Sequence, residues 1–220
     1  MKITHIGHAC FTVDINGVIL AFDPYDDSVG IPMPKIEAEK LYISHEHYDH
    51  NNRAAVKKQN LIRLDGTTYH DKQIKSWHDD VGGKKRGENI IHVVQACEAP
   101  TVFWTEDTEL RVICHLGDLG QILTDKQVKE IEDAAHWILR DKSGFSQIDV
   151  LLVPVGGNYT IDAKQAVTVC QQLNPKLIIP MHYKTPGVVL DIAPIDEFVK
   201  LAKKNNLPVT VLGPGESCNF

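Results

Sequence analysis

A dense cluster of potential metal ligands, His45-Glu46-His47-Tyr48-Asp49-His50, follows the apolar run Leu41-Tyr42-Ile43 in this chain. Imidazole nitrogens and carboxylate oxygens suit zinc and similar divalent ions. At the end of a strand, His45 and His47 project to the same side. Asp49 and His50 lead into a predicted helix over residues 51–58 and leave in another direction, so one cluster can serve two adjacent metal positions. The alternative, a solvated turn with surface histidines, is not favoured for this density after an apolar strand.

Length and charge limit the remaining possibilities. With 220 residues, of which 43% are hydrophobic, the chain is long enough for a substantial core in one large domain or two small ones. The net charge is −6, and the sequence has no basic tail or Lys/Arg stripe that would indicate binding to nucleic acid. No run reaches the roughly 18 apolar residues of a membrane span, and the N-terminus enters a strand-like pattern without a signal segment.

The cysteine content indicates a reducing compartment. The five cysteines are an odd number, lie far apart and contain no CxxC pair; they are Cys10, Cys97, Cys114, Cys170 and Cys218. Most stand in apolar contexts, where free cysteine behaves as a small hydrophobic residue. We therefore expect a cytoplasmic protein with reduced thiols.

The order of apolar segments predicts strands first and helices later. Strands are predicted over residues 3–6, 10–15, 18–22, 41–44, 61–64, 73–77, 89–95, 102–105, 110–115, 150–155, 177–180 and 208–212. Asn16-Gly17 predicts a hairpin turn. Helices are predicted over residues 125–139, with Thr124 as N-cap, and over 162–173 and 194–205. Two sheets packed face to face with helices outside, a four-layer αββα sandwich in one domain over residues 1–220, is the predicted α+β architecture.

Further motifs extend the pattern along nearly the whole chain. They are Ile6-Gly7-His8-Ala9-Cys10, Asp23-Pro24-Tyr25, His78-Asp79-Asp80, Arg86-Gly87-Glu88-Asn89, His115-Leu116-Gly117-Asp118-Leu119-Gly120, Pro154-Val155-Gly156-Gly157-Asn158-Tyr159 and Ile179-Pro180-Met181-His182-Tyr183. Together with the His45–His50 cluster they resemble the metallo-β-lactamase superfamily, and within it the small metal-dependent hydrolases near the ascorbate-6-phosphate lactonase-like proteins. The resemblance implies the αββα sandwich of that superfamily; it says little about the substrate.

The resemblance also implies a set of site residues. The implied ligands of a first metal are His45, His47 and His78, those of a second are Asp49, His50 and His182, and Asp118 bridges both. Asp118, Asp49 and His8 are the implied catalytic residues, although a structural hydrogen bond is an equal alternative for His8. Asp23 is expected to support the ligand loop, with a simple turn carboxylate as the alternative. His115 is expected to be packed or to support a ligand, and its alternative is to replace His78 as a ligand.

The implied chemistry is hydrolysis by a hydroxide shared between two divalent ions, most naturally Zn²⁺, with Mn, Fe or Ni as alternatives. The expected substrate is a small anionic ester, lactone or phosphodiester. No Gly-x-Ser-x-Gly nucleophile motif is present in the sequence. Two other functions remain open: a nuclease, which the acidic charge disfavours, and a diiron redox protein, whose relatives have glutamate where this chain has His47.

Three segments leave their roles open. Gly82-Gly83-Lys84-Lys85-Arg86-Gly87 is either an anion clamp or a solvated turn. Tyr159 is a candidate donor to a substrate oxygen. Residues 133–147, with Trp137, Ile138 and Phe145, either cap the cleft or form a contact between subunits of a homo-oligomer.

Overall fold

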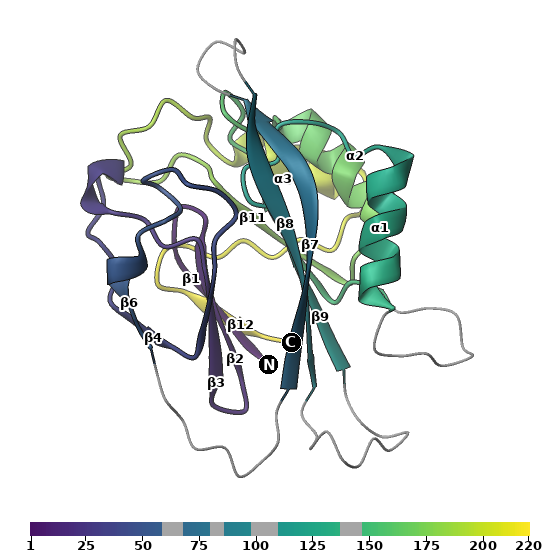
Figure 1. The fold of residues 1–220 in the computed structure, drawn as a ribbon. Helices are drawn as coiled ribbons and strands as arrows, with labels where there is room; N and C mark the ends of the chain where they lie inside the picture. Colours follow the sequence, from purple (N-terminus) through teal and green to yellow (C-terminus); the bar gives the residue numbers. More distant parts are fainter. Residues whose placement is uncertain (59–67, 80–85, 98–109, 137–146) are drawn as a thin grey trace.

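Two five-stranded sheets face each other in the computed structural model, which describes residues 1–58, 68–79, 86–97, 110–136 and 147–220 (Figure 1). The first sheet has the order β12-β1-β2-β3-β5, and its strands are β12 (Ser217–Asn219), β1 (Lys2–Gly7), β2 (Cys10–Ile15), β3 (Val18–Phe22) and β5 (Lys40–Tyr42). The neighbouring strands are antiparallel except for β3 and β5. Asn16 and Gly17 both have positive φ, at 51° and 83°, so the predicted hairpin forms between β2 and β3.

The second sheet has the order β11-β10-β9-β8-β7. Its strands are β11 (Leu177–Met181), β10 (Val150–Pro154), β9 (Leu110–His115), β8 (Arg86–Cys97) and β7 (Thr68–Asp79). A long antiparallel pair, β7 and β8, forms one side of this sheet, whereas β9, β10 and β11 run parallel. The parallel strands need crossover connections, which the helices supply.

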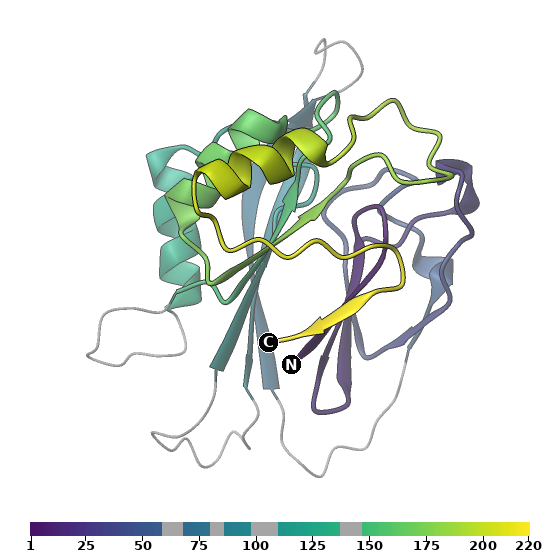
Figure 2. The ribbon, with the colours of Figure 1, turned by 180° about the vertical axis from the view of Figure 1, so that it is seen from behind.

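The three α-helices of the described residues, α1 (Asp125–Ala135), α2 (Ala163–Leu173) and α3 (Asp196–Lys204), cover the outer face of the second sheet (Figures 1 and 2). Capping boxes begin two of them, Thr124 with Gln127 in α1 and Asp162 with Gln165 in α2. The outer face of the first sheet is covered by 3-10 helices η1 (Asp27–Val29) and η2 (Arg53–Ala55) and the small sheet of β4 (Ile36–Ala38) and β6 (Val56–Lys58). The predicted α+β sandwich is confirmed.

Apolar side chains fill the space between these layers. Phe11 and Leu20 of the first sheet meet Ile113 and Leu152 of the second in a core from which water is excluded. A second core lies between the second sheet and the helices, with Phe198 of α3 among its fully buried side chains. The two sheets are therefore held at a constant spacing by close packing, which gives the loops at their ends a rigid support.

Three sequence predictions differ from the structure. The predicted helix over residues 51–58 is wrong: only η2 is helical, and β6 pairs in parallel with β4. Tertiary pairing overrides local helix preference here. Instead of a strand over 208–212, only Val209 bridges Ile178, and β12 is the final strand. Helix α1 ends at Ala135. The predicted strands over 61–64 and 102–105 lie outside the described residues.

The helices and the cysteines bear on the expectations about membrane spans and thiols. Of the α-helices in the described part of the chain, none combines the length and the apolar character that crossing a bilayer requires. The thiols of Cys10, Cys114, Cys170 and Cys218 are free, and burial raises the pKa of the Cys114 thiol. Such buried thiols are unreactive packing groups.

Candidate metal centre

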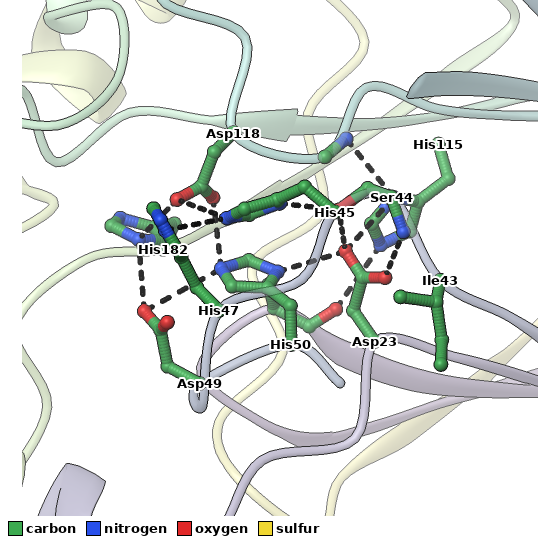
Figure 3. Close-up of polar contacts among 12 residues, drawn as sticks. Asp23, Ile43, Ser44, His45, His47, Asp49, His50, His115, Asp118 and His182 are labelled. Carbon is green, nitrogen blue, oxygen red and sulfur yellow. Dashed lines mark hydrogen bonds and ion pairs between the residues drawn. The ribbon is translucent and has the colours of Figure 1, made fainter. Parts of the chain in front are cut away.

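Seven predicted ligands, drawn from loops and strand ends of both sheets, come together in the structure, and Figure 3 labels all of them except His78. Residues 44–50 form the loop after β5, His78 lies near the end of β7, Asp118 follows β9 and His182 follows β11. His8 lies in the turn between β1 and β2. Loops at strand ends on a packed scaffold are common positions for functional side chains.

Three histidines form the first set of donors, called here the three-histidine group: His45, His47 and His78. The Nε2 of His45 lies 3.0 Å from the Nδ1 of His47. The ring of His78 lies 4.7 Å from that of His45 and 4.6 Å from that of His47, measured between centroids. Three imidazoles that converge in this way can serve as the protein ligands of one divalent ion.

A second set, called here the mixed group, contains His8, Asp49, His50 and His182. The Oδ2 atom of Asp49 lies 3.2 Å from His8 Nε2, 3.5 Å from His50 Nε2 and 3.9 Å from His182 Nε2. All four residues are buried. The structure therefore brings together the three residues predicted for the second metal and adds His8 to them.

Asp118 lies between the two groups. Its Oδ1 is 3.0 Å from His50 Nε2, while its Oδ2 is 3.3 Å from His182 Nε2 and 3.8 Å from His45 Nε2. One carboxylate oxygen thus faces histidines of both groups. Among the described residues no other carboxylate has this position between the two groups.

The carboxylate of Asp23 sets the tautomers of two histidines (Figure 3). Its Oδ2 accepts hydrogen bonds from His50 Nδ1, at 2.8 Å, and from the Ser44 hydroxyl, at 2.5 Å. Because Ser44 donates its only hydroxyl proton to Asp23, its oxygen accepts a hydrogen bond from His45 Nδ1, 3.0 Å away. With their Nδ1 atoms engaged in this way, both histidines turn their Nε2 atoms towards the centre, the atoms that would bind a metal.

Several buried nitrogen and oxygen atoms of the centre have no hydrogen-bond partner in the described part of the chain, and a cation fits among them. The Nε2 atoms of His50 and His182 and the Oδ1 of Asp118 are buried and make no hydrogen bond within the described residues. An unprotonated Nε2 of His50 would meet the lone pairs of Asp118, which is unfavourable unless a cation lies between them. The nitrogen and oxygen donors match zinc and similar divalent ions.

The pKa directions agree with this description. Burial lowers the pKa of His45 to about 3 and that of His8 to about 4, so both rings are neutral at neutral pH. Burial opposes ionisation of Asp118, yet His182 and His50 hold the pKa of its carboxyl well below the usual value. For His50, burial is outweighed by Asp118, Asp49 and Asp23, which raise its pKa well above the usual value. A bound metal ion would take the place of that proton.

Two glycines leave room for site residues. A Cβ at Gly87, which pairs with His78 across β7 and β8, would lie 2.0 Å from His78 Nε2. Gly117 has φ of 55°, and a Cβ there would lie 2.3 Å from Asn89 Oδ1. Asn89 accepts from the Asp118 backbone N–H at 2.9 Å and donates to Leu116 O at 2.9 Å. The turn that presents Asp118 is thus fixed on both sides.

His115 lies outside the three candidate donor groups. Its Nε2 donates to Ala9 O at 3.1 Å, and its Nδ1 accepts from the Gly117 N–H at 3.0 Å. The ring stacks on Phe22 with 5.3 Å between centroids. Both ring nitrogens are occupied by backbone groups, which corresponds to the expected packed histidine.

The sequence did not predict the roles of three supporting residues, Ser44, Asn89 and His92, although Asn89 belongs to one of the motifs. The Nδ1 of His92 lies 3.0 Å from the Asp71 carboxylate, and its Nε2 lies 3.0 Å from Ile43 O, two residues before His45. Single polar residues, such as Ser44 in a loop or Asn89 and His92 in β8, carry no sequence signal of such contacts. Lys84 and Lys85, and residues 137–146 with Trp137, Ile138 and Phe145, lie outside the described residues.

The chain is similar in sequence and in fold to several known proteins. A family model described as the beta-lactamase superfamily domain matches residues 2–182. A UPF0173 metal-dependent hydrolase of Carboxydothermus hydrogenoformans is 29% identical over 240 aligned residues, covering 98% of each chain. A UPF0173 protein of Pyrococcus abyssi is 32% identical over 189 residues and 85% of each chain. A solved structure from Thermotoga maritima, of a candidate zinc-dependent hydrolase of the metallo-β-lactamase superfamily, has 37% identity and a TM-score of 0.62 and covers 91% of this chain and 84% of that one.

Proposed function

The chain belongs to the metallo-β-lactamase superfamily as a metal-dependent hydrolase, and we propose that it uses two divalent ions, Zn²⁺ in the first place, to cleave an ester, lactone or phosphodiester bond in a small anionic substrate. The position of the Asp118 carboxylate between the three-histidine group and the mixed group supports this proposal most directly. One ion would be held by His45, His47 and His78, the other by Asp49, His50 and His182, with Asp118 shared.

Two divalent ions, when bound, supply an activated water at neutral pH and polarise the bond under attack. Asp118 and Asp49 keep their negative charge, because neighbouring histidines hold the pKa of both carboxyls below the usual value despite their burial. Each can therefore accept a hydrogen bond from the attacking water and orient it, and on this ground we assign them catalytic roles. Asp49 is the more accessible, with 10% of its side chain exposed against 3% for Asp118.

Local charge supports an anionic substrate. Two divalent cations exceed the negative charge of Asp49, Asp118 and the nearby Asp23 by one unit, which leaves a positive centre as long as the bound water is uncharged, in a chain whose overall charge is −6. An anion close to that centre is attracted by several kcal/mol, on the order expected at an effective dielectric near 20. Tyr159, half-buried beyond β10, stays a candidate donor to a substrate oxygen.

Metal analysis followed by an activity panel tests the proposal. Protein reconstituted with zinc is expected to bind two equivalents and to hydrolyse at least one class among lactones, esters and phosphodiesters, while a chelator abolishes the activity. Binding that never exceeds one equivalent would contradict the dinuclear centre. Activity that persists in fully chelated protein would contradict the metal-dependent mechanism itself.

A further inference from the structure

We propose that His8 is a metal ligand, so that the second metal position of this chain is enclosed by four protein side chains: His8, Asp49, His50 and His182. The inference rests on the proposed two-metal function and deepens it. It distinguishes the two positions by their number of protein donors, since, apart from the shared Asp118, the mixed group has four and the three-histidine group three.

The backbone at His8 has an unusual conformation. Strands β1 and β2 pair up to Gly7 and Cys10, so His8 and Ala9 are the two turn residues between them. His8 has φ of 52°, in the left-handed region, at the first turn position, where glycine is the preferred residue. A histidine with this backbone is disfavoured by local sterics, and such residues concentrate where the side chain serves a function.

Neighbouring groups keep the turn in place. The His8 carbonyl accepts hydrogen bonds from His5 Nε2, at 3.1 Å, and from the His182 backbone N–H, at 3.2 Å. His182 also has φ of 52°. The contact between these two residues therefore joins the β1–β2 turn to the end of β11 and sets both imidazoles side by side, with 4.2 Å between their centroids.

The His8 side chain points into the mixed group and not towards solvent. It is completely buried, and its Nε2 lies 3.2 Å from Asp49 Oδ2. Its Nδ1 is also buried and has no hydrogen-bond partner among the described residues. One ring nitrogen of His8 and one donor atom each of Asp49, His50 and His182 all lie within 4.8 Å of one another.

The distances between the donor atoms of the mixed group suit ligands of one shared cation. Two ligands bound at about 2.05 Å in a tetrahedral zinc site lie roughly 3.3 Å apart. The separations of Asp49 Oδ2 from His8 Nε2 and from His50 Nε2 are 3.2 and 3.5 Å. A simple hydrogen bond from His8 to Asp49 would give the same distance but would leave His8 as a positioning residue, and the experiment below separates the two roles.

A difference between the two positions follows. With the shared Asp118 counted at both positions, the mixed group would supply five protein ligands and the three-histidine group four, so the three-histidine group leaves more room for water or substrate. The mixed group would then retain its ion more strongly, whereas the three-histidine group would be the position open to substrate.

The test counts histidine ligands by proton NMR of the protein loaded with two equivalents of Co²⁺. Each ligating imidazole contributes one N–H resonance shifted far outside the normal range by the paramagnetic ion. We expect six such resonances in the unchanged protein, from His8, His45, His47, His50, His78 and His182, and five in His8→Gln. In chelator competition, His8→Gln should also bind one of its two cobalt equivalents more than roughly 100-fold more weakly than the unchanged protein. Loss of a residue that only supports a ligand weakens metal binding by about 10- to 100-fold.

His115→Gln is the matched control, because His115 is equally buried but lies outside the donor groups; it should keep six resonances. Five resonances in the unchanged protein, with the same five in His8→Gln, would overturn the proposal and make His8 a hydrogen-bonding partner of Asp49. The count in the unchanged protein decides even if His8→Gln fails to fold. Absence of any cobalt binding would instead refute the metal-dependent function, and the role of His8 with it.

Discussion

Asp23 accepts a hydrogen bond of 2.8 Å from His50, although 27 positions separate the two residues in the chain. The same carboxylate binds Ser44, which in turn receives a hydrogen bond from His45. A single residue that is not itself in any candidate donor group thus orients one histidine of the mixed group and one of the three-histidine group.

Replacing Asp23 with asparagine should weaken both metal positions. The amide keeps the size of the side chain but loses the charge that favours the Nδ1–H tautomers of His50 and His45. We expect about 10- to 100-fold weaker metal binding, the range found for outer partners of metal ligands, measured by chelator competition. Ser44→Ala removes only the branch to His45 and should weaken one equivalent. If Asp23→Asn and Ser44→Ala weakened the binding of both metal equivalents equally, Asp23 would not support His50 directly and His45 through Ser44.

Asp118→Ala should abolish hydrolysis while the protein stays folded, because it removes the carboxylate between the two groups and leaves two cations close together. His115→Ala should reduce activity less and keep both metal equivalents. Activity assays with metal analysis on the same samples check both. Loss of a metal from His115→Ala, without loss from His78→Ala, would reverse the assignment of the third histidine.

His92 should make stability depend on pH. It lies between two hydrogen-bond acceptors, Asp71 and Ile43 O, and only the protonated ring can donate to both. Burial opposes that charge, but Asp71 and the Ile43 carbonyl raise the pKa of His92 above its usual value. A raised folded-state pKa stabilises the protein fully below the unfolded value of about 6.5, and this contribution disappears as the pH rises through the folded value.

His92→Gln should therefore cost about 1.5 kcal/mol of unfolding free energy near pH 5.5 and clearly less near pH 9. Urea unfolding in the presence of a chelator measures this without interference from metal binding. Asp71→Asn should reduce the same pH dependence. An equal cost of His92→Gln at both pH values would show that the ring is not charged in the folded protein.

A methyl group at Gly87 should damage the three-histidine group selectively. The Cβ of Gly87→Ala would lie 2.0 Å from His78 Nε2, so the imidazole must move. We expect loss of one metal equivalent and an activity decrease on the order of 100-fold. Gly213→Ala, whose Cβ would meet Glu216 at 3.4 Å, is the control and should retain both. Retention of both equivalents in Gly87→Ala would show that His78 is not needed as a ligand.

Substrate charge should affect turnover. Given the positive centre, kcat/KM should be higher for an anionic ester or phosphodiester than for its neutral analogue, and the difference should shrink as salt rises. A matched pair of substrates assayed at low and high ionic strength measures the effect. Equal values for the pair would indicate an apolar substrate pocket.

Elements whose signals are local could be predicted from sequence alone. Thr124 caps α1 and Asp162 caps α2, and Asn16-Gly17 forms the first hairpin. Each depends on side chains within three or four residues of one another, so no distant partner is needed. The helix expected over residues 51–58 failed for the opposite reason, because residues 56–58 find their partner in β4.

The sequence by itself determined the types of donors and their local order, because His45, His47, Asp49 and His50 lie within six consecutive residues of the chain. Tertiary structure alone decided how the donors are oriented and which distant residues join them. The tautomers of His45 and His50 depend on Asp23, the position of Asp118 depends on Asn89, and His8 joins Asp49 only because the β1–β2 turn packs against His182. Hydrogen-bond directions and contacts between remote strands arise from the packing of the two sheets, which no local pattern of residues contains.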